Sequence, residues 1–147
     1  MGRMLTNGCA TLYNRWEEAD GERCVRTVLP AVFWENALEG GFAGRRYSKK
    51  GQELLSAVRV LIPGTAVSGE RAYLPPKAWR LLEPQERAAY FTFQIGDLLV
   101  FGDCPYRWDP QTPLRELTRQ YDETASIRLI RRVVVPSGFS HWELEGV

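Results

Sequence analysis

The sequence predicts a mainly β fold, either a small antiparallel β-barrel or a curved sheet, with two or three short helices and one long loop. Apolar residues fall in short runs rich in β-branched and aromatic types, and Gly, Pro and Asp separate these runs, as is typical of strands and turns. The chain has 147 residues, of which 44% are hydrophobic and 25% are charged. This size and composition indicate a single domain over residues 1–147.

The first two strands are predicted to form a hairpin. Residues 9–16 alternate loosely and lead to Asp20-Gly21, a pair that readily adopts the positive φ of a tight turn. Pro30 has no amide hydrogen and therefore marks an edge or a bulge in the second strand, residues 24–34. Strict alternation along that strand places five residues on one face: Val25, Thr27, Leu29, Ala31 and Phe33.

Residues 36–53 are predicted to form a flexible loop, because they are rich in glycine and have little to bury. The loop carries four basic side chains, Arg45, Arg46, Lys49 and Lys50. They are interpreted either as a solvated charge run or as a projection that touches phosphate or an acidic partner.

The centre of the sheet is predicted at residues 98–101, a continuous apolar run suited to a strand buried on both faces. Phe91, Phe93 and Ile95 alternate with polar residues just before it and indicate another strand. Residues 58–62, stopped by Pro63-Gly64, indicate a third strand after the hairpin, and residues 104–108 could add a short one.

The prolines predict short helical connectors. One helical turn is expected after Pro75-Pro76, with Trp79 and Leu82 on one side, and a second short helix at Pro84. A further helix is predicted from Thr112, as its N-cap, through Tyr121.

The last part of the chain is again predicted to be extended, with a final antiparallel strand over residues 139–144 after the turn at Pro136-Ser137-Gly138. Before that turn, four residues are expected on one face of a strand: Ile127, Leu129, Val133 and Val135.

The sequence offers little for catalysis. The three cysteines lack metal-ligand spacing, and a cysteine such as Cys104 could meet the single histidine, His141, only through the fold. Asp97 and Asp103 flank the central strand and could form a carboxylate pair, although turn chemistry explains them better. We therefore expect no enzymatic activity, no metal and no cofactor; the enzyme alternative is a cysteine- or histidine-dependent hydrolase.

Charge and hydropathy exclude other classes. With 19 Lys and Arg against 18 Asp and Glu the net charge is +1, which is not that of a strongly basic nucleic-acid binder. No apolar run is long enough to span a bilayer, and the first residues lack the pattern of a secretory signal. These observations predict no membrane association and point to the cytosol.

Five tryptophans lie near Arg or Lys and permit two interpretations. They could be stacking platforms of a single-strand-binding barrel, or they could be buried in the core and against another subunit. The second interpretation predicts a homo-oligomer, and the candidate interface residues are Trp16, Trp34, Trp79, Trp108 and Trp142.

Six segments of the chain stand in a characteristic order, namely residues 11–14, 32–34, 58–63, 90–93, 96–102 and 141–144. Their order resembles that of an uncharacterised family encoded in the structural gene cassettes of tailed bacteriophages and prophages. Within it, a strand that ends in Ile62-Pro63, followed later by one led by Gly96-Asp97, is also similar to head-closure, or stopper, proteins.

The resemblance implies a non-catalytic β-barrel that forms a ring around the DNA channel of a virion assembled in the host cytoplasm. Its partners would be portal, adaptor or tail proteins. Arg45, Arg46, Lys49 and Lys50 would face packaged DNA, without base specificity, or the neighbouring ring. The helical connectors near Trp79 depart from the stopper pattern and leave adaptor or other minor virion roles open. The alternative is a small nucleic-acid-binding β-barrel domain.

Overall fold

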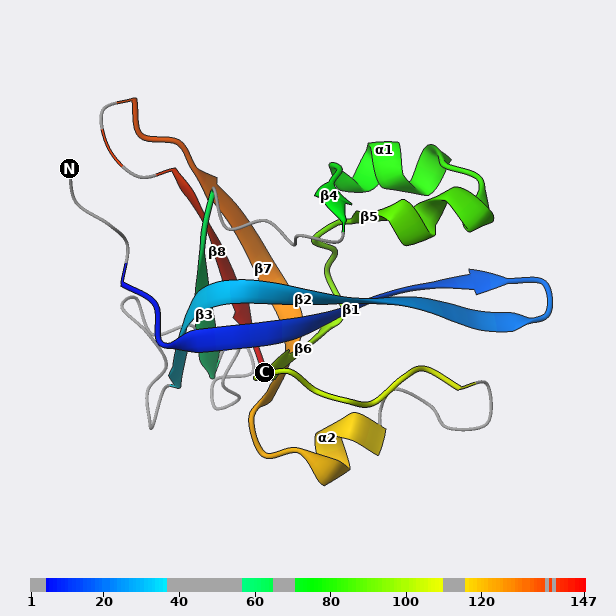
Figure 1. Cartoon of the computed structure of the whole chain (residues 1–147), viewed down its shortest axis with the longest axis horizontal. Helices are drawn as coiled ribbons and strands as arrows, with labels where there is room; N and C mark the ends of the chain where they lie inside the picture. Colours follow the sequence, from blue (N-terminus) through cyan, green and yellow to red (C-terminus); the bar gives the residue numbers. More distant parts are fainter. Residues whose placement is uncertain (1–4, 37–56, 65–70, 110–115, 137, 139) are drawn as a thin grey trace, which may run out of the picture.

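The protein is described by a computed structural model that covers residues 5–36, 57–64, 71–109, 116–136, 138 and 140–147 (Figure 1). The predicted loop over residues 36–53 lies outside the described residues, apart from its first residue, which ends a strand. The strands are β1 (Gly8–Glu18), β2 (Gly21–Asn36), β3 (Val58–Pro63), β4 (Ala72–Tyr73), β5 (Tyr90–Phe91), β6 (Leu98–Phe101), β7 (Thr124–Val133) and β8 (His141–Gly146). The helices are α1 (Pro76–Leu81), the 3₁₀-helix η1 (Pro84–Ala89) and α2 (Leu117–Gln120).

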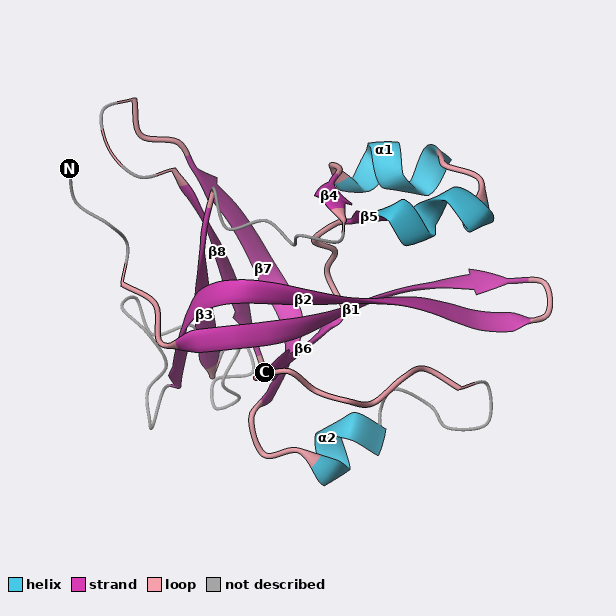
Figure 2. Ribbon diagram, in the orientation of Figure 1, coloured by secondary structure: helices cyan, strands magenta, loops and turns pink. Residues whose placement is uncertain are grey.

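The fold is mainly β, as predicted, and six antiparallel strands form its body (Figure 2). They pair in the order β1-β2-β3-β8-β7-β6, and β6 pairs in turn with β1, so the sheet closes into a small barrel. The short strands β4 and β5 form a separate parallel pair. The barrel core is apolar, and its fully enclosed side chains include Leu12, Leu29, Val60, Leu99 and Leu144.

The hairpin of β1 and β2 is longer than the barrel and forms an arm that projects from it (Figure 1). Gly21, at φ +127°, begins β2 after the predicted Asp20-Gly21 turn, which is confirmed. In the figure α1 lies on one side of the arm and α2 on the other. A second hydrophobic cluster, outside the barrel core, joins the arm to α2 through Tyr13, Cys104 and Leu117.

A bulge in β2 overturns part of the predicted face pattern. Ala10 pairs with Leu29 whereas Gly8 pairs with Val32, so β2 has one extra residue at Pro30-Ala31, the position where a bulge was one of the two predictions. The extra residue reverses the side-chain alternation after it. Val32 and Trp34 are therefore buried, and the prediction that Ala31 and Phe33 share a face with Leu29 is wrong.

The buried central strand is confirmed, but the strand predicted before it is mostly absent. Within β6, Leu98, Leu99 and Val100 are all buried. Only Tyr90–Phe91 is extended in a ladder, and Ile95 is 60% exposed. Residues 92–95 do not continue β5 because the backbone of Thr92 bonds to a side chain, that of Asn14, in place of a neighbouring strand.

Strand β7 also departs from strict alternation. Its register with β8 shifts between Ile127 and Leu129, and Ile130 packs against the barrel core. The prediction that Leu129 follows Ile127 on one buried face is therefore wrong. The strand ends at Val133, and β8 runs from His141 rather than from residue 139, which lies outside the described residues.

The first two predicted helices are present. Pro76 opens α1, in which Trp79 is fully buried, and Pro84 opens η1. Of the helix predicted from Thr112 to Tyr121, the described part is α2, and its first half lies outside the described residues. Residues 104–108 form no strand but run beside the arm as an irregular segment, and Cys104, Tyr106 and Trp108 belong to the same cluster as Tyr13 and Cys24 of the arm.

Candidate functional site

The structure places the candidate thiol and imidazole in different surroundings. Cys104 is 3% exposed and packs beside Tyr13 and Leu117 in the cluster between the arm and α2. His141 begins β8 opposite Val133, and its Nε2 lies 3.3 Å from a carboxylate oxygen of Glu143. The thiol and the imidazole therefore belong to separate packing regions.

Cys24, on β2 in the arm, is kept in its thiol form. Burial raises its pKa far above the ordinary value, and the nearby carboxylates of Asp97 and Glu22 raise it further. Because the thiolate is the reactive form of cysteine, this side chain is a poor nucleophile at neutral pH.

The two candidate carboxylates do not form a pair. The Asp103 side chain is 68% exposed and forms an ion pair with Arg26 on the arm. Asp97 precedes β6 in the sequence, whereas Asp103 follows it. The Asp97 side chain is buried and accepts hydrogen bonds from Asn14 and Gln94. The alternative of paired carboxylates at this strand is therefore wrong.

A buried polar hub joins the arm to the segment before β6. Asn14 Nδ2 donates to the Thr92 carbonyl oxygen and to Asp97 Oδ2, at 2.8 Å each, and the Thr92 amide donates to Asn14 Oδ1 at 3.1 Å. Gln94 Nε2 also donates to Asp97 Oδ2 at 2.8 Å, and the Arg15 amide donates to Asp97 Oδ1 at 3.4 Å. Sequence analysis missed this hub.

Burial raises the pKa of Asp97 from 3.8 to about 6, although the hydrogen bonds from Gln94, Asn14 and the Arg15 amide act in the opposite direction. The carboxylate is therefore a structural acceptor that the fold holds away from solvent. Its position, enclosed at 2% exposure, leaves no room for a substrate to reach it.

Asp97→Asn is expected to alter how stability depends on pH. The folded-state pKa lies above the unfolded one, so Asp97 stabilises the fold fully below pH 3.8 and loses this contribution as the pH rises through 6. The difference in unfolding free energy between the natural protein and Asp97→Asn should therefore change by about 2 kcal/mol between pH 4.5 and 7.5, in favour of Asn at the higher pH. Urea unfolding at the two pH values measures it, and an unchanged difference would contradict the assignment.

Two of the five candidate interface tryptophans are enclosed by their own chain. Trp34 is 4% exposed and packs against Phe101, and Trp79 has no exposed surface. Trp79 and Trp16 meet edge to face at 5.3 Å, with the Arg87 guanidinium over both rings. These contacts attach α1 and η1 to the arm. The candidates that retain partial exposure are Trp16, Trp108 and Trp142.

Trp142 lies in an aromatic pocket of about 320 Å³ at the end of the barrel. Tyr73 and Phe93 contact its ring at 4.9 and 5.2 Å between centroids, and the Arg132 guanidinium lies 4.5 Å over it. The guanidinium therefore takes up one face of the indole, on which a nucleotide base would otherwise be able to stack.

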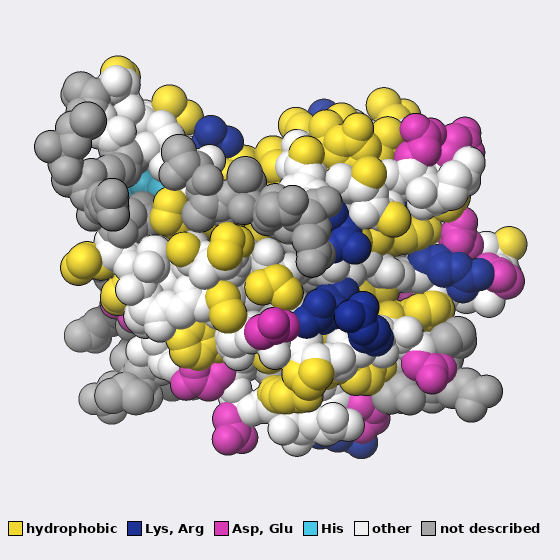
Figure 3. All heavy atoms as spheres, in the orientation of Figure 1, with side chains coloured by type: hydrophobic (Ala, Val, Ile, Leu, Met, Phe, Trp, Pro, Cys, Tyr) yellow, Lys and Arg dark blue, Asp and Glu magenta, His cyan; other side chains and the backbone are white. Residues whose placement is uncertain are grey.

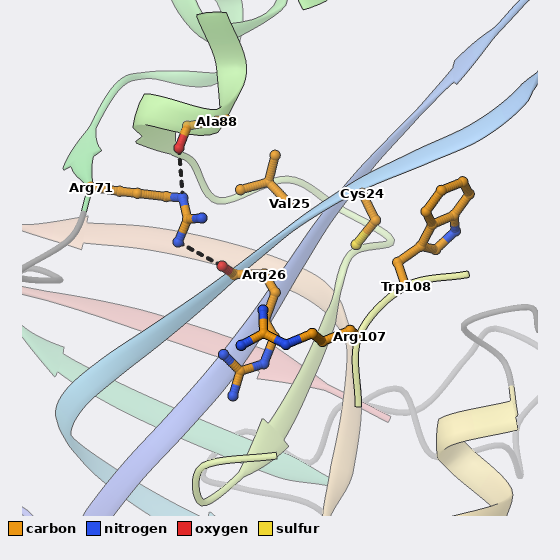
Figure 4. Close-up of a pocket in the computed structure, with 7 residues that line it drawn as sticks. All are labelled: Cys24, Val25, Arg26, Arg71, Ala88, Arg107 and Trp108. Carbon is orange, nitrogen blue, oxygen red and sulfur yellow. Dashed lines mark hydrogen bonds between the residues drawn. The ribbon is translucent and has the colours of Figure 1, made fainter. Parts of the chain in front are cut away.

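A second pocket, of about 260 Å³, lies along β2 in the arm and is lined by three arginines (Figure 4). We call it the arginine groove, and its lining residues are Cys24, Val25, Arg26, Arg71, Ala88, Arg107 and Trp108. No Asp or Glu lines it. Figure 3 shows Lys and Arg side chains gathered near the middle of this face of the molecule.

Two of the groove's arginines are fixed by backbone carbonyls. Arg71 donates from Nε to the Ala88 oxygen at 2.8 Å and from Nη1 to the Arg26 oxygen at 2.7 Å, and Figure 4 shows its side chain reaching across to β2. Arg26 donates twice to the Cys104 oxygen, at 2.9 and 2.6 Å. In the same figure the guanidinium groups of Arg26 and Arg107 lie next to each other. Sequence analysis missed this group, whose members come from three separate segments.

Comparison with known proteins gives one match. A family described as "Family of unknown function (DUF6751)" matches residues 5–147. The chain belongs to the DUF6751 family. No curated protein and no solved structure matches it.

For this DUF6751 chain, the described residues hold no group of three or more His, Cys, Asp and Glu side chains that could bind a metal ion. Within the same residues no helix has the length and apolar character needed to cross a membrane. The predicted basic site, Arg45, Arg46, Lys49 and Lys50, lies outside the described residues.

Proposed function

We propose that the chain is a non-enzymatic structural subunit of a tailed-phage or prophage particle, a head-tail connector of the head-closure or adaptor kind. One observation carries the proposal. The small antiparallel barrel has, between β2 and β3, a connection over residues 37–57 that holds Arg45, Arg46, Lys49 and Lys50. The sequence resemblance implies this order of a barrel and a basic connection.

In this function several copies form a ring around the DNA channel, between portal, adaptor or tail proteins. A head-to-tail contact closes a ring when its rotation allows. The projecting arm supports such an arrangement. The strands of the closed barrel are already paired with one another, whereas the arm presents a further surface outside the barrel. A ring also repeats the basic connection in each subunit, so that a net charge of only +1 is compatible with phosphate contact at the pore.

The chemistry of the described side chains supports a structural role. Burial disfavours the thiolate of Cys24, and Asp97 is enclosed in hydrogen bonds from its own chain. Cys24 and Asp97 are residue types that a nucleophilic or an acid-base mechanism could use, but their surroundings here favour a structural role.

The test is assembly on a portal ring encoded beside the gene. When the purified, unaltered protein is mixed with that portal, electron microscopy is expected to show an additional ring of density on the portal. Replacing Arg45, Arg46, Lys49 and Lys50 together with alanine should leave docking intact but reduce retention of packaged DNA, if these residues face the channel. Failure to dock on the portal or on any adaptor-bearing portal would contradict the proposal.

The alternative, a nucleic-acid-binding barrel, predicts a different property for the isolated monomer. It requires binding to short single-stranded DNA that weakens steeply with salt, and a base-stacking face. Trp34 and Trp79 are buried, and the Arg132 guanidinium lies over the Trp142 ring, so these three tryptophans favour the structural subunit. Tight, salt-dependent binding by the monomer would reverse this preference.

A further inference from the structure

The outer edge of β2 in the arm is not paired with another strand. Residues Phe33–Asn36 of β2 pair with β3, whereas the portion from Gly21 to Val32 pairs only with β1. The arginine groove lies along this unpaired portion, beside Cys24, Val25 and Arg26. An unpaired edge presents backbone donors and acceptors to any strand that can approach it.

The side-chain contacts show which residues of β2 turn their backbone groups outward. In an antiparallel pair, residues alternate between bonding across the ladder and pointing away from it. The Arg26 oxygen accepts from Arg71, so Arg26 points outward. Its neighbour in the same phase, Cys24, lies opposite Arg15, whose amide and carbonyl likewise bond away from β2, to Asp97 and Gln94.

Cys24, Arg26 and Val28 therefore share the outward phase. In the part of the chain that the structure describes, only the Arg26 carbonyl among their outward backbone groups has a hydrogen-bond partner, the Arg71 side chain. The arm thus offers three consecutive outward positions to which a strand could bond.

Charge selects the kind of strand that fits. Arg26, Arg71 and Arg107 lie along the groove and no acidic residue lines it. Arg26 is partly neutralised by Asp103, whereas Arg107 is exposed and forms no ion pair among the described residues. A strand with carboxylates on one face, at alternate positions, would place them beside these guanidinium groups, which match carboxylate geometry.

We propose that the arginine groove binds an extended acidic segment of a partner protein by strand addition to the edge of β2. That the partner is a neighbouring virion protein rests on the proposed function. The incoming strand replaces the Arg71 side-chain bond at the Arg26 carbonyl with a backbone bond, and its carboxylates pair with the arginines. The cavity is smaller than the roughly 300–1,000 Å³ of typical small-molecule sites, which suits a strand that is covered on one side only.

A second copy of this chain fits the groove less well. Two β2 edges paired with each other would bring the arginines of both copies together, and like charges across an interface are unfavourable. The acidic tip of the arm is already engaged, because Arg23 pairs with Glu18 and Asp20, and Arg15 pairs with Glu22. The acidic segment is therefore assigned to a different protein.

The experiment uses the full chain and a fluorescent peptide in which threonine alternates with glutamate. Anisotropy is expected to show binding, and hydrogen exchange of the Cys24, Arg26 and Val28 amides is expected to slow. A peptide methylated on the amide nitrogens of alternate residues, in the phase that bonds to β2, should bind at least about tenfold more weakly, because it keeps the charge but loses the backbone bonds. A peptide of alternating threonine and lysine should not bind.

Arg107→Glu should weaken binding of the acidic peptide by about tenfold or more, since it places a like charge in the groove. The matched control is Arg128→Glu, an exposed arginine on β7 that does not line the groove, and it should leave binding unchanged. Equal loss in both variants, or equal binding of the methylated peptide, would overturn the inference. Displacement of the peptide by single-stranded DNA would overturn it in favour of nucleic acid.

The result can be separated from the test of the proposed function. Docking on the portal without any binding of the acidic peptide overturns the inference alone. Peptide binding that depends on Arg107 and on the backbone amides, with no docking on the portal, upholds the groove and overturns the connector function.

Discussion

Replacing Asn14 with alanine is expected to lower the free energy of unfolding by about 4 kcal/mol. The substitution removes the donor to Asp97 and both bonds to the Thr92 backbone, and it leaves these groups buried without partners. Each unsatisfied buried group costs on the order of 1–3 kcal/mol, more when it is charged. Because Asn14 lies on the arm and Thr92 and Asp97 precede the central strand, the loss should also loosen the arm from the barrel.

Asn7 supplies a matched control for this substitution. It makes the same pair of bonds to a backbone, donating to the Trp34 oxygen and accepting from the Trp34 amide at 2.8 Å each, but its own side chain is exposed. Water can satisfy the groups left by Asn7→Ala, so its cost should be about 1 kcal/mol. Urea unfolding of both variants followed by circular dichroism measures the two effects. Equal costs would contradict the view that enclosure, rather than bond number, gives the hub its strength.

Trp79→Ala is expected to cost about 3–5 kcal/mol. The side chain has no exposed surface, and its removal leaves a cavity between α1 and the arm. The Trp16 and Trp79 indole N–H groups have no acceptor among the described residues, so ring contacts and the Arg87 guanidinium provide the attachment. The variant should therefore release α1 and η1 before the barrel unfolds.

Hydrogen exchange of the α1 amides, together with denaturant unfolding, measures both parts of this prediction. Leu81→Ala is the control, because Leu81 lies on the same helix with 87% of its surface exposed and its loss should change stability by less than about 0.5 kcal/mol. A double-mutant cycle between Trp16 and Trp79 should give a coupling of about 0.5–1.5 kcal/mol beyond the separate losses. Additive effects would show that the two rings contribute independently.

Local patterns predicted the elements that local chemistry determines. The Asp20-Gly21 turn, the helix starts at Pro76 and Pro84 and the buried strand of residues 98–101 all follow from residue types within a few positions. The predictions failed where the backbone departs from regular alternation. The bulge at Pro30 was one of the predicted alternatives, but its effect on every later residue of β2 was not carried into the face assignment.

The candidate site was less accessible to sequence reasoning because its parts meet only in the fold. Asn14 and Asp97 are 83 positions apart, and Arg71 reaches a carbonyl 45 positions away. From the sequence, Asp97 was interpreted as a turn residue. None of the residues next to it indicated that the side-chain amide of Asn14, in the first strand, would bond to it. For the arginine groove the available signal was weak, namely an arginine in each of three segments otherwise rich in apolar residues.

The bulge in β2 separates the length of the strand from the direction in which its side chains face. Before Pro30 the strand runs from the arm into the barrel core at Leu29, and after it the same strand lines the barrel with Val32 and Trp34. Deletion of the one extra residue at Pro30-Ala31 would restore strict alternation and leave Val32 and Trp34 facing inwards. Divergent members of such a fold can thus differ by one residue in the spacing from the turn at Gly21 to the first bond with β3 and still keep the same core.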